Sequence, residues 1–224
     1  MLYLLLLLLL LLLSSTSSLS LSVTPFTSPL SLSLTPLTFT VCENLLSISG
    51  EDFTVYSSTS EPLYKIIGSN KVPFGIGGAV LDKLELRYPS PSNAEICTIE
   101  RRLISPTTTY DIYITGRYYG KIIRSLNPIK KVYDFYYGEV KWFTATCSNV
   151  LSRKFVINDV KTRKRVGEFS RSLFEFKEDV DSYGCVVEVG GVDVGAVVAL
   201  VCVVDEDHDE EVEKKRKIRK EKKK

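Results

Sequence analysis

Apolar and polar residues alternate along most of the chain between residues 51 and 188. Phe155 and Ile157, for example, alternate with Lys154 and Asn158. A period of two with one apolar face is typical of strands in an antiparallel sheet, and the frequent Tyr, Val, Ile, Phe and Thr residues favour strands further. The pattern therefore predicts a predominantly β domain.

The alternating segments are short, and turns that contain Gly, Pro, Asn or Asp separate them, which is the spacing of hairpins. Such a sheet has two exposed edges unless it closes, and closing residues 50–190 into a barrel removes them. About a dozen strands are predicted, over residues 53–58, 62–67, 79–87, 95–104, 109–115, 118–124, 131–137, 140–148, 154–158, 164–170, 173–178 and 183–189.

One segment near the C-terminal end of the chain, Val192–Val204, is apolar on every side. At about 13 residues it is too short to span a bilayer as a helix, so it must be enclosed by protein. We predict that it forms a helix in the lumen of the barrel. Its valines suit a further strand almost as well, and this alternative stays open at the level of the sequence.

Residues 1–44 form a Leu/Ser-rich segment of low complexity, with no charged residue before Glu43. The leucine run resembles the apolar part of a secretory signal peptide or a membrane anchor, although no Lys or Arg precedes it. The alternative is a translated CT-rich leader or a gene-model error, because Leu, Ser, Pro and Phe all have codons made only of pyrimidines. Residues 1–40 are expected to add nothing to the fold, and the barrel domain is expected to span residues 45–206.

The last segment, residues 207–224, is acidic and then strongly basic. It is predicted to be a disordered, solubilising tail, and the alternative is that its basic block pairs with the acidic run Glu206–Glu213 just before it. The cation block from Lys214 to Lys224 is also typical of a nuclear-localisation signal or of a tether to anionic membranes.

The formal net charge of the chain is +2, and its body is nearly neutral, so we expect no nucleic-acid partner. Five cysteines are scattered without a CxxC pair, which favours small apolar filler in a reducing, cytoplasmic compartment. The basic tail leaves a nuclear or membrane-associated location open, and the leucine run leaves secretion open. The domain is expected to be a monomer.

Residues that could carry catalysis are scarce. The single histidine, His208, lies in an acidic run, so no Ser/His or Cys/His relay can be built elsewhere. Asp205–Asp209 begins like a calcium loop, but Glu210 and Arg216 stand where a Gly and a bidentate Glu are required. The sequence therefore predicts a protein that is not an enzyme, with no catalytic residues, no metal site and no cofactor.

Several segments occur in an order and spacing that match a known pattern. They are Glu51–Tyr56 with Pro62–Gly68, Ile99–Tyr113, Lys154–Asp159 with Arg165–Arg171, and Asp181–Asp193 followed by Val197–Asp205. Together they resemble the LURP-one-related family over most of the chain after residue 50. The chain departs from the family pattern at the turn Asp159–Arg163, which is longer and more basic, and at Gly190-Gly191.

The resemblance implies a tubby C-terminal-like fold: all-β with one central helix, built as a closed antiparallel twelve-stranded barrel around a hydrophobic C-terminal helix. It also implies a non-catalytic binding module, of a family with many plant members, in defence or membrane-linked signalling. The alternatives are a scramblase-like lipid-handling protein and a secreted ligand-binding β-barrel. The first alternative is weaker, because the cysteine-rich segment and calcium motif of scramblases are missing from this sequence.

Basic residues crowd the late hairpin and form a candidate site for anionic ligands. In a tubby-like barrel they could present cations to phospholipid or phosphoinositide headgroups, each contributing roughly 1 kcal/mol. A protein partner is the alternative, and ordinary solvent-facing strand positions would account for the same residues without any ligand. Arg101 and Arg102 form a second cluster. The candidate anionic-lipid contacts are Lys154, Lys161, Arg163, Lys164, Arg165 and Arg171.

Overall fold

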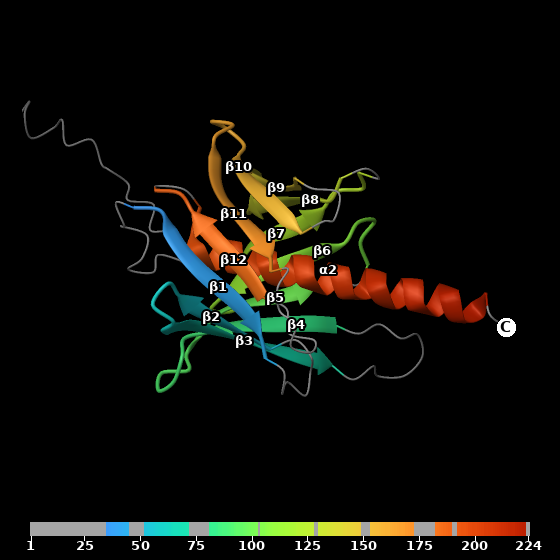
Figure 1. Ribbon diagram of the computed structural model, residues 1–224, viewed down its shortest axis with the longest axis horizontal. Helices are drawn as coiled ribbons and strands as arrows, with labels where there is room; N and C mark the ends of the chain where they lie inside the picture. Colours follow the sequence, from blue (N-terminus) through green and yellow to red (C-terminus); the bar gives the residue numbers. More distant parts are fainter. Residues whose placement is uncertain are drawn as a thin grey trace, which may run out of the picture.

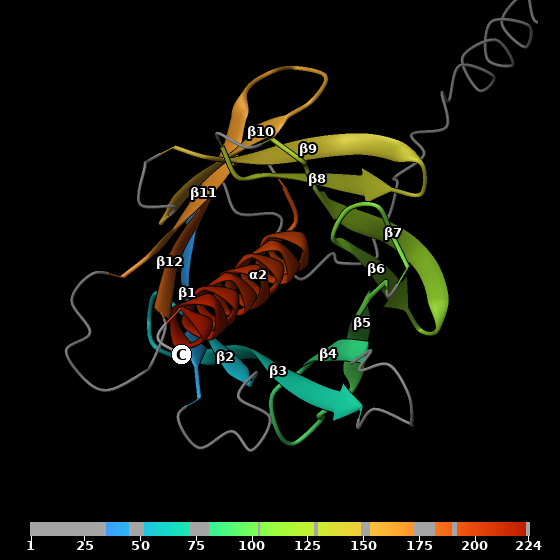
Figure 2. The same cartoon turned by 90° about the vertical axis from the view of Figure 1, so that its right-hand side faces the viewer.

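The computed structural model describes residues 35–44, 52–71, 81–102, 104–127, 130–148, 153–172, 182–189 and 192–222. In this part of the chain, antiparallel strands form one sheet that closes on itself around a single helix, as the view along the barrel in Figure 2 shows. The strands are β1 (Leu37–Glu43), β2 (Phe53–Ser57), β3 (Pro62–Lys71), β4 (Leu81–Arg87), β5 (Glu95–Arg101), β6 (Thr109–Ile114), β7 (Arg117–Arg124), β8 (Val132–Tyr137), β9 (Val140–Cys147), β10 (Lys154–Asp159), β11 (Arg165–Arg171) and β12 (Ser182–Val187).

Each strand pairs with its neighbours in sequence, and β1 closes the barrel by pairing with both β12 and β2. The apolar side chains of the alternating pattern point inward. In β10, Phe155 and Ile157 are buried, while the residues that alternate with them are only partly buried. Phe155 stacks on Phe169 of β11 with 5.0 Å between ring centroids, so aromatic rings line part of the lumen. The predicted all-β class and closed barrel are confirmed.

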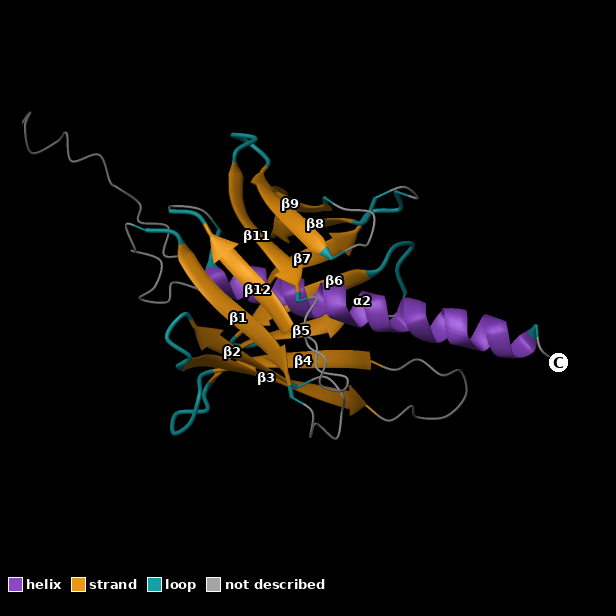
Figure 3. Ribbon diagram, in the orientation of Figure 1, coloured by secondary structure: helices purple, strands orange, loops and turns teal. Residues whose placement is uncertain are grey.

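The helix, α2 (Val194–Glu221), passes through the lumen and leaves it at the far side (Figures 1 and 3). Its first three turns carry the apolar run, whose side chains are buried against the strands. Asp193 caps the helix, because its side chain accepts a hydrogen bond from the Gly195 backbone N–H at 2.7 Å. The segment Val192–Val204 is therefore a lumen helix and not a further strand.

The two ends of the barrel differ in what they carry. Because neighbouring strands are antiparallel, the turns 58–61, 88–94, 115–116, 138–139 and 160–164 lie at the same end as the start of α2. We call this the turn end. The opposite end, where α2 emerges and β7 ends, is the exit end. Any surface that combines side chains from several of these turns must therefore lie at the turn end.

Eleven of the predicted strands coincide with strands of the barrel, and the candidate over residues 173–178 lies outside the described residues. The prediction that residues 1–44 stand apart from a domain beginning at residue 45 was wrong, because β1 lies within them. Phe39 and Val41 of β1 are buried in the core. The alternation of β1 is short and is embedded in a Leu/Ser/Thr-rich stretch, which hid it.

The prediction of a disordered tail over residues 207–224 was also wrong for the residues that are described, since α2 continues to Glu221. Two contacts hold the helix where it leaves the barrel: the Tyr183 hydroxyl donates to Asp205 at 2.6 Å, and the Tyr133 hydroxyl donates to Asp207 at 2.8 Å. The buried half of the helix provides the nucleus from which the polar half propagates. Arg219 and Lys220 in the last turn favour it further through the helix dipole.

None of the helices in the described part of the chain combines the length and apolar character needed to cross a membrane.

Candidate functional site

The β10–β11 hairpin ends in a turn whose backbone is held by a single carboxylate. The Asp159 side chain accepts hydrogen bonds from the Thr162 backbone N–H at 2.6 Å and from the Thr162 hydroxyl at 2.9 Å. These hydrogen bonds lower the pKa of Asp159, so the carboxylate stays ionised and keeps the turn closed. The Arg163 backbone N–H also donates to the Asp159 carbonyl at 3.0 Å. The turn is therefore a defined structure that fixes where its side chains begin.

Three cations project from this turn: Lys161, Arg163 and Lys164, which we call the hairpin cations. All three side chains are exposed. Between residues that the structure describes, none of the three has a carboxylate oxygen within 4 Å. Their charge is therefore available to a ligand that approaches the turn end.

The other predicted contact residues are placed differently. Lys154 and Arg165 both reach the Glu168 carboxylate, at 2.8 and 3.2 Å, and Arg165 also lies 3.5 Å from Glu188. Lys154 begins β10 and Arg171 ends β11, so both lie about 20 Å along the strands from the turn. The structure therefore brings together the hairpin cations and Arg165, and it separates Lys154 and Arg171 from them.

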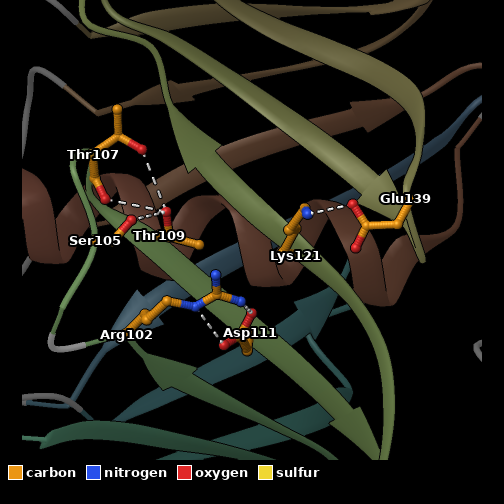
Figure 4. Close-up of polar contacts among 7 residues, drawn as sticks. All are labelled: Arg102, Ser105, Thr107, Thr109, Asp111, Lys121 and Glu139. Carbon is orange, nitrogen blue, oxygen red and sulfur yellow. Dashed lines mark hydrogen bonds and ion pairs between the residues drawn. The ribbon is translucent and has the colours of Figure 1, made fainter.

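The second predicted cluster does not present free cations. Arg102 donates two hydrogen bonds to Asp111 of β6, at 3.1 and 2.6 Å, and Figure 4 shows this pair on the outer face of the sheet. Arg101 contributes positive charge near Asp207, at the exit end. Ser105, Thr107 and Thr109, which exchange hydroxyl contacts beside the Arg102 pair, add no charge.

A group of apolar side chains adjoins the hairpin cations. Tyr137 and Val140 face each other across the β8–β9 turn and are 45% and 56% exposed. Tyr137 contacts Trp142 at 5.2 Å and Tyr119 at 4.9 Å between ring centroids. We call Tyr119, Tyr137, Val140 and Trp142 the apolar rim. This group was not predicted from the sequence, although the aromatic residues on both sides of Gly138 are a usable signal.

The apolar rim and the hairpin cations are joined through the backbone. The Val160 N–H at the tip of the β10–β11 hairpin donates to the Trp142 carbonyl at 2.9 Å. Asp193 is close enough to Tyr119 of the rim to act on its ionisation, and burial raises the pKa of Asp193 to about 7. Its carboxyl is therefore partly protonated at neutral pH, which reduces the negative charge near Tyr119.

The exit end carries a second and separate charged region. Arg124 contacts Asp207 at 3.5 Å and Glu211 at 2.5 Å, and Lys131 contacts Glu211 at 3.0 Å. Beyond these ion pairs the described side chains of residues 214–222 are exposed, and most are Lys or Arg; we call this segment the basic arm. Figure 1 shows that it projects away from the barrel. The hairpin cations and the basic arm lie at opposite ends, so they do not form one surface.

The acidic run Asp205–Asp209 lies within α2, where Asp205 and Asp207 accept hydrogen bonds from tyrosine hydroxyls. Over the described ranges, no three His, Cys, Asp or Glu side chains are grouped so that they could hold a metal. All five cysteines are free thiols, and Cys97, Cys147, Cys185 and Cys202 are buried. Burial raises the pKa of the Cys97 thiol to about 12, so it is protonated at neutral pH.

Comparison with known proteins agrees with this architecture. The family model described as LURP-one-related matches residues 37–205, so the match begins at β1 and ends on α2. In fold the chain is similar to an X-ray structure of a protein from Arabidopsis thaliana, with a TM-score of 0.55 and 15% sequence identity. That similarity covers 81% of this chain and 96% of the other chain. No curated protein matches the chain.

Proposed function

The chain belongs to the LURP-one-related family, and we propose that its barrel is a non-catalytic binding module that docks on anionic membrane surfaces through the hairpin cations. The observation that carries the proposal is the display of Lys161, Arg163 and Lys164 on an ordered turn without described carboxylate partners. In this proposal the module acts in membrane-linked signalling, and phosphatidylserine or phosphoinositide headgroups are its ligands.

The size of the expected attraction follows from the number of available charges. A Lys or Arg near an anionic leaflet contributes about 1 kcal/mol, so the three hairpin cations together contribute about 3 kcal/mol, or roughly 100-fold in partitioning. Arg165 and Lys154 add less, because each is already compensated by Glu168. Of the six predicted residues, Lys154 and Arg165 are paired and Arg171 lies at the far end of β11, so the proposal takes the three hairpin cations as the main contacts.

Neutralising the hairpin cations tests the proposal. We expect the full chain carrying Lys161→Gln, Arg163→Gln and Lys164→Gln to lose about 100-fold in partitioning onto vesicles that contain phosphatidylserine or phosphoinositide, measured by cosedimentation at low salt. Binding of the unsubstituted chain should also weaken steeply with salt, because exposed charges are screened within about 8 Å at physiological ionic strength. The three side chains are exposed, so thermal stability should be unchanged.

The basic arm supplies the matched control. Lys214→Gln, Lys215→Gln and Arg216→Gln remove the same charge from the exit end, and we expect partitioning to change only a few-fold, since the arm lies away from the proposed surface. All variants keep the same N-terminal segment, so any contribution of that segment is common to them. Equal binding of the hairpin variant and the unsubstituted chain, or no preference for anionic over neutral vesicles, would contradict the proposal and favour a protein partner.

A further inference from the structure

Exposed apolar side chains concentrate at the turn end of the barrel. Of the eight large hydrophobic residues exposed in the described part of the chain, five lie in or beside its turns: Tyr88, Tyr118, Tyr137, Val140 and Val189. Scattered exposed hydrophobics are normal on a soluble surface, but several gathered at one end indicate a binding face. Tyr137 and Val140 share one turn and contact the rest of the apolar rim.

We propose that the apolar rim inserts into the interfacial layer of an anionic bilayer, beside the hairpin cations, and gives membrane binding a component that salt does not remove. This inference rests on the proposed function and extends it from charge attraction to insertion. It adds Tyr137, Val140 and Trp142 as contacts of the acyl-chain and glycerol region.

The chemistry of the rim fits the boundary between headgroups and acyl chains. Tyr and Trp rings have an apolar body and a polar edge, and they are enriched where a membrane meets water. The binding of a peripheral protein grows with the apolar surface that it buries and with the attraction of its cations to anionic lipids. Because the Val160 N–H bonds to the Trp142 carbonyl, rim and hairpin cations reach the same surface together.

The carboxylate on the turn of the rim is compensated, which favours an anionic partner. Glu139, at the tip of the β8–β9 turn, is 81% exposed, but its carboxylate lies 2.7 Å from the Lys121 ammonium group. Figure 4 shows Lys121 directed toward Glu139 from β7. The Lys121 ammonium group also lies 5.3 Å from the centre of the Tyr136 ring. Together with the hairpin cations, this arrangement complements a negative, partly apolar layer and selects an anionic bilayer as the occupant.

The chain contains one tryptophan, so the emission of Trp142 reports directly on the rim. We expect the full chain to show blue-shifted emission on binding phosphatidylserine vesicles, and quenching when the acyl chains carry bromine near the headgroup. Neither change should occur with neutral vesicles. If the chain cosediments with these vesicles but Trp142 emission does not change, the inference is overturned and the proposed function stands. If the chain does not cosediment with them at all, the proposed function itself is contradicted.

Salt separates the two components of binding. At about 1 M salt the screening length falls to about 3 Å, so only the inserted part should remain. We expect the double variant Tyr137→Ser and Val140→Ser to lose about tenfold in residual partitioning at high salt, while its loss at low salt is smaller. Ile104→Ser removes an apolar side chain that is more exposed, at 94%, but lies at the exit end, and it should have no effect. Equal losses for both variants, or no loss for the rim variant, would overturn insertion by the rim.

Discussion

Replacing Leu200 with Asp is expected to unfold the barrel. Leu200 is fully buried in the lumen, among the apolar residues of α2 and the inward side chains of the strands. An unpaired charge at this position would lose its hydration without gaining a partner. The expected cost exceeds about 4 kcal/mol, a large part of the stability of an ordinary domain. Thermal or denaturant unfolding, followed by circular dichroism, measures it.

Ile218→Asp is the matched control for this experiment. It makes a similar apolar-to-acidic change on the same helix, but in the basic arm, where the side chain is 51% exposed. We expect its unfolding midpoint to stay close to that of the unsubstituted chain. If Leu200→Asp were as stable as Ile218→Asp, α2 would not be the core of the barrel.

Loss of β1 should be nearly as damaging, because β1 is the strand that closes the sheet between β12 and β2. Val41→Asp places a charge at a fully buried position of β1, and we expect a loss of several kcal/mol in the free energy of unfolding. Thr38→Asp, in the same strand but at an exposed position, should change it by less than about 0.5 kcal/mol. Similar stabilities for the two variants, measured by chemical denaturation, would show that β1 is not part of the barrel.

Local patterns predicted most of the barrel, and non-local contacts account for what they missed. The alternation of Phe155 and Ile157 identifies β10 without any knowledge of its partners, because the period of two is a property of the local sequence. The strand β1 pairs with β2 and also with β12, which lies near the other end of the chain, and its short pattern does not reveal this second partner. In sequence, the polar half of α2 resembles a disordered segment. The hydrogen bond from the Tyr133 hydroxyl to Asp207, which holds the helix where it leaves the barrel, is seen only in the folded structure.

The candidate site shows the same division. The sequence located the basic β10–β11 turn, and the structure retains Lys161, Arg163 and Lys164 as exposed cations. The sequence alone does not show that Glu168 binds both Lys154 and Arg165, because these ion pairs depend on how far the side chains reach across and along the paired strands. The apolar rim likewise combines Tyr119 with Tyr137 and Trp142, and only the folded sheet brings these aromatic rings into contact.

The most direct test of the central claim, that the turn end is the membrane-binding surface, is amide hydrogen exchange of the full chain with and without phosphatidylserine vesicles. Bound vesicles should slow exchange at residues 137–142 and 159–165, which contain the rim and the hairpin turn. Exchange in the basic arm should be unchanged. Protection confined to residues 214–222, or equal protection with neutral vesicles, would contradict the claim.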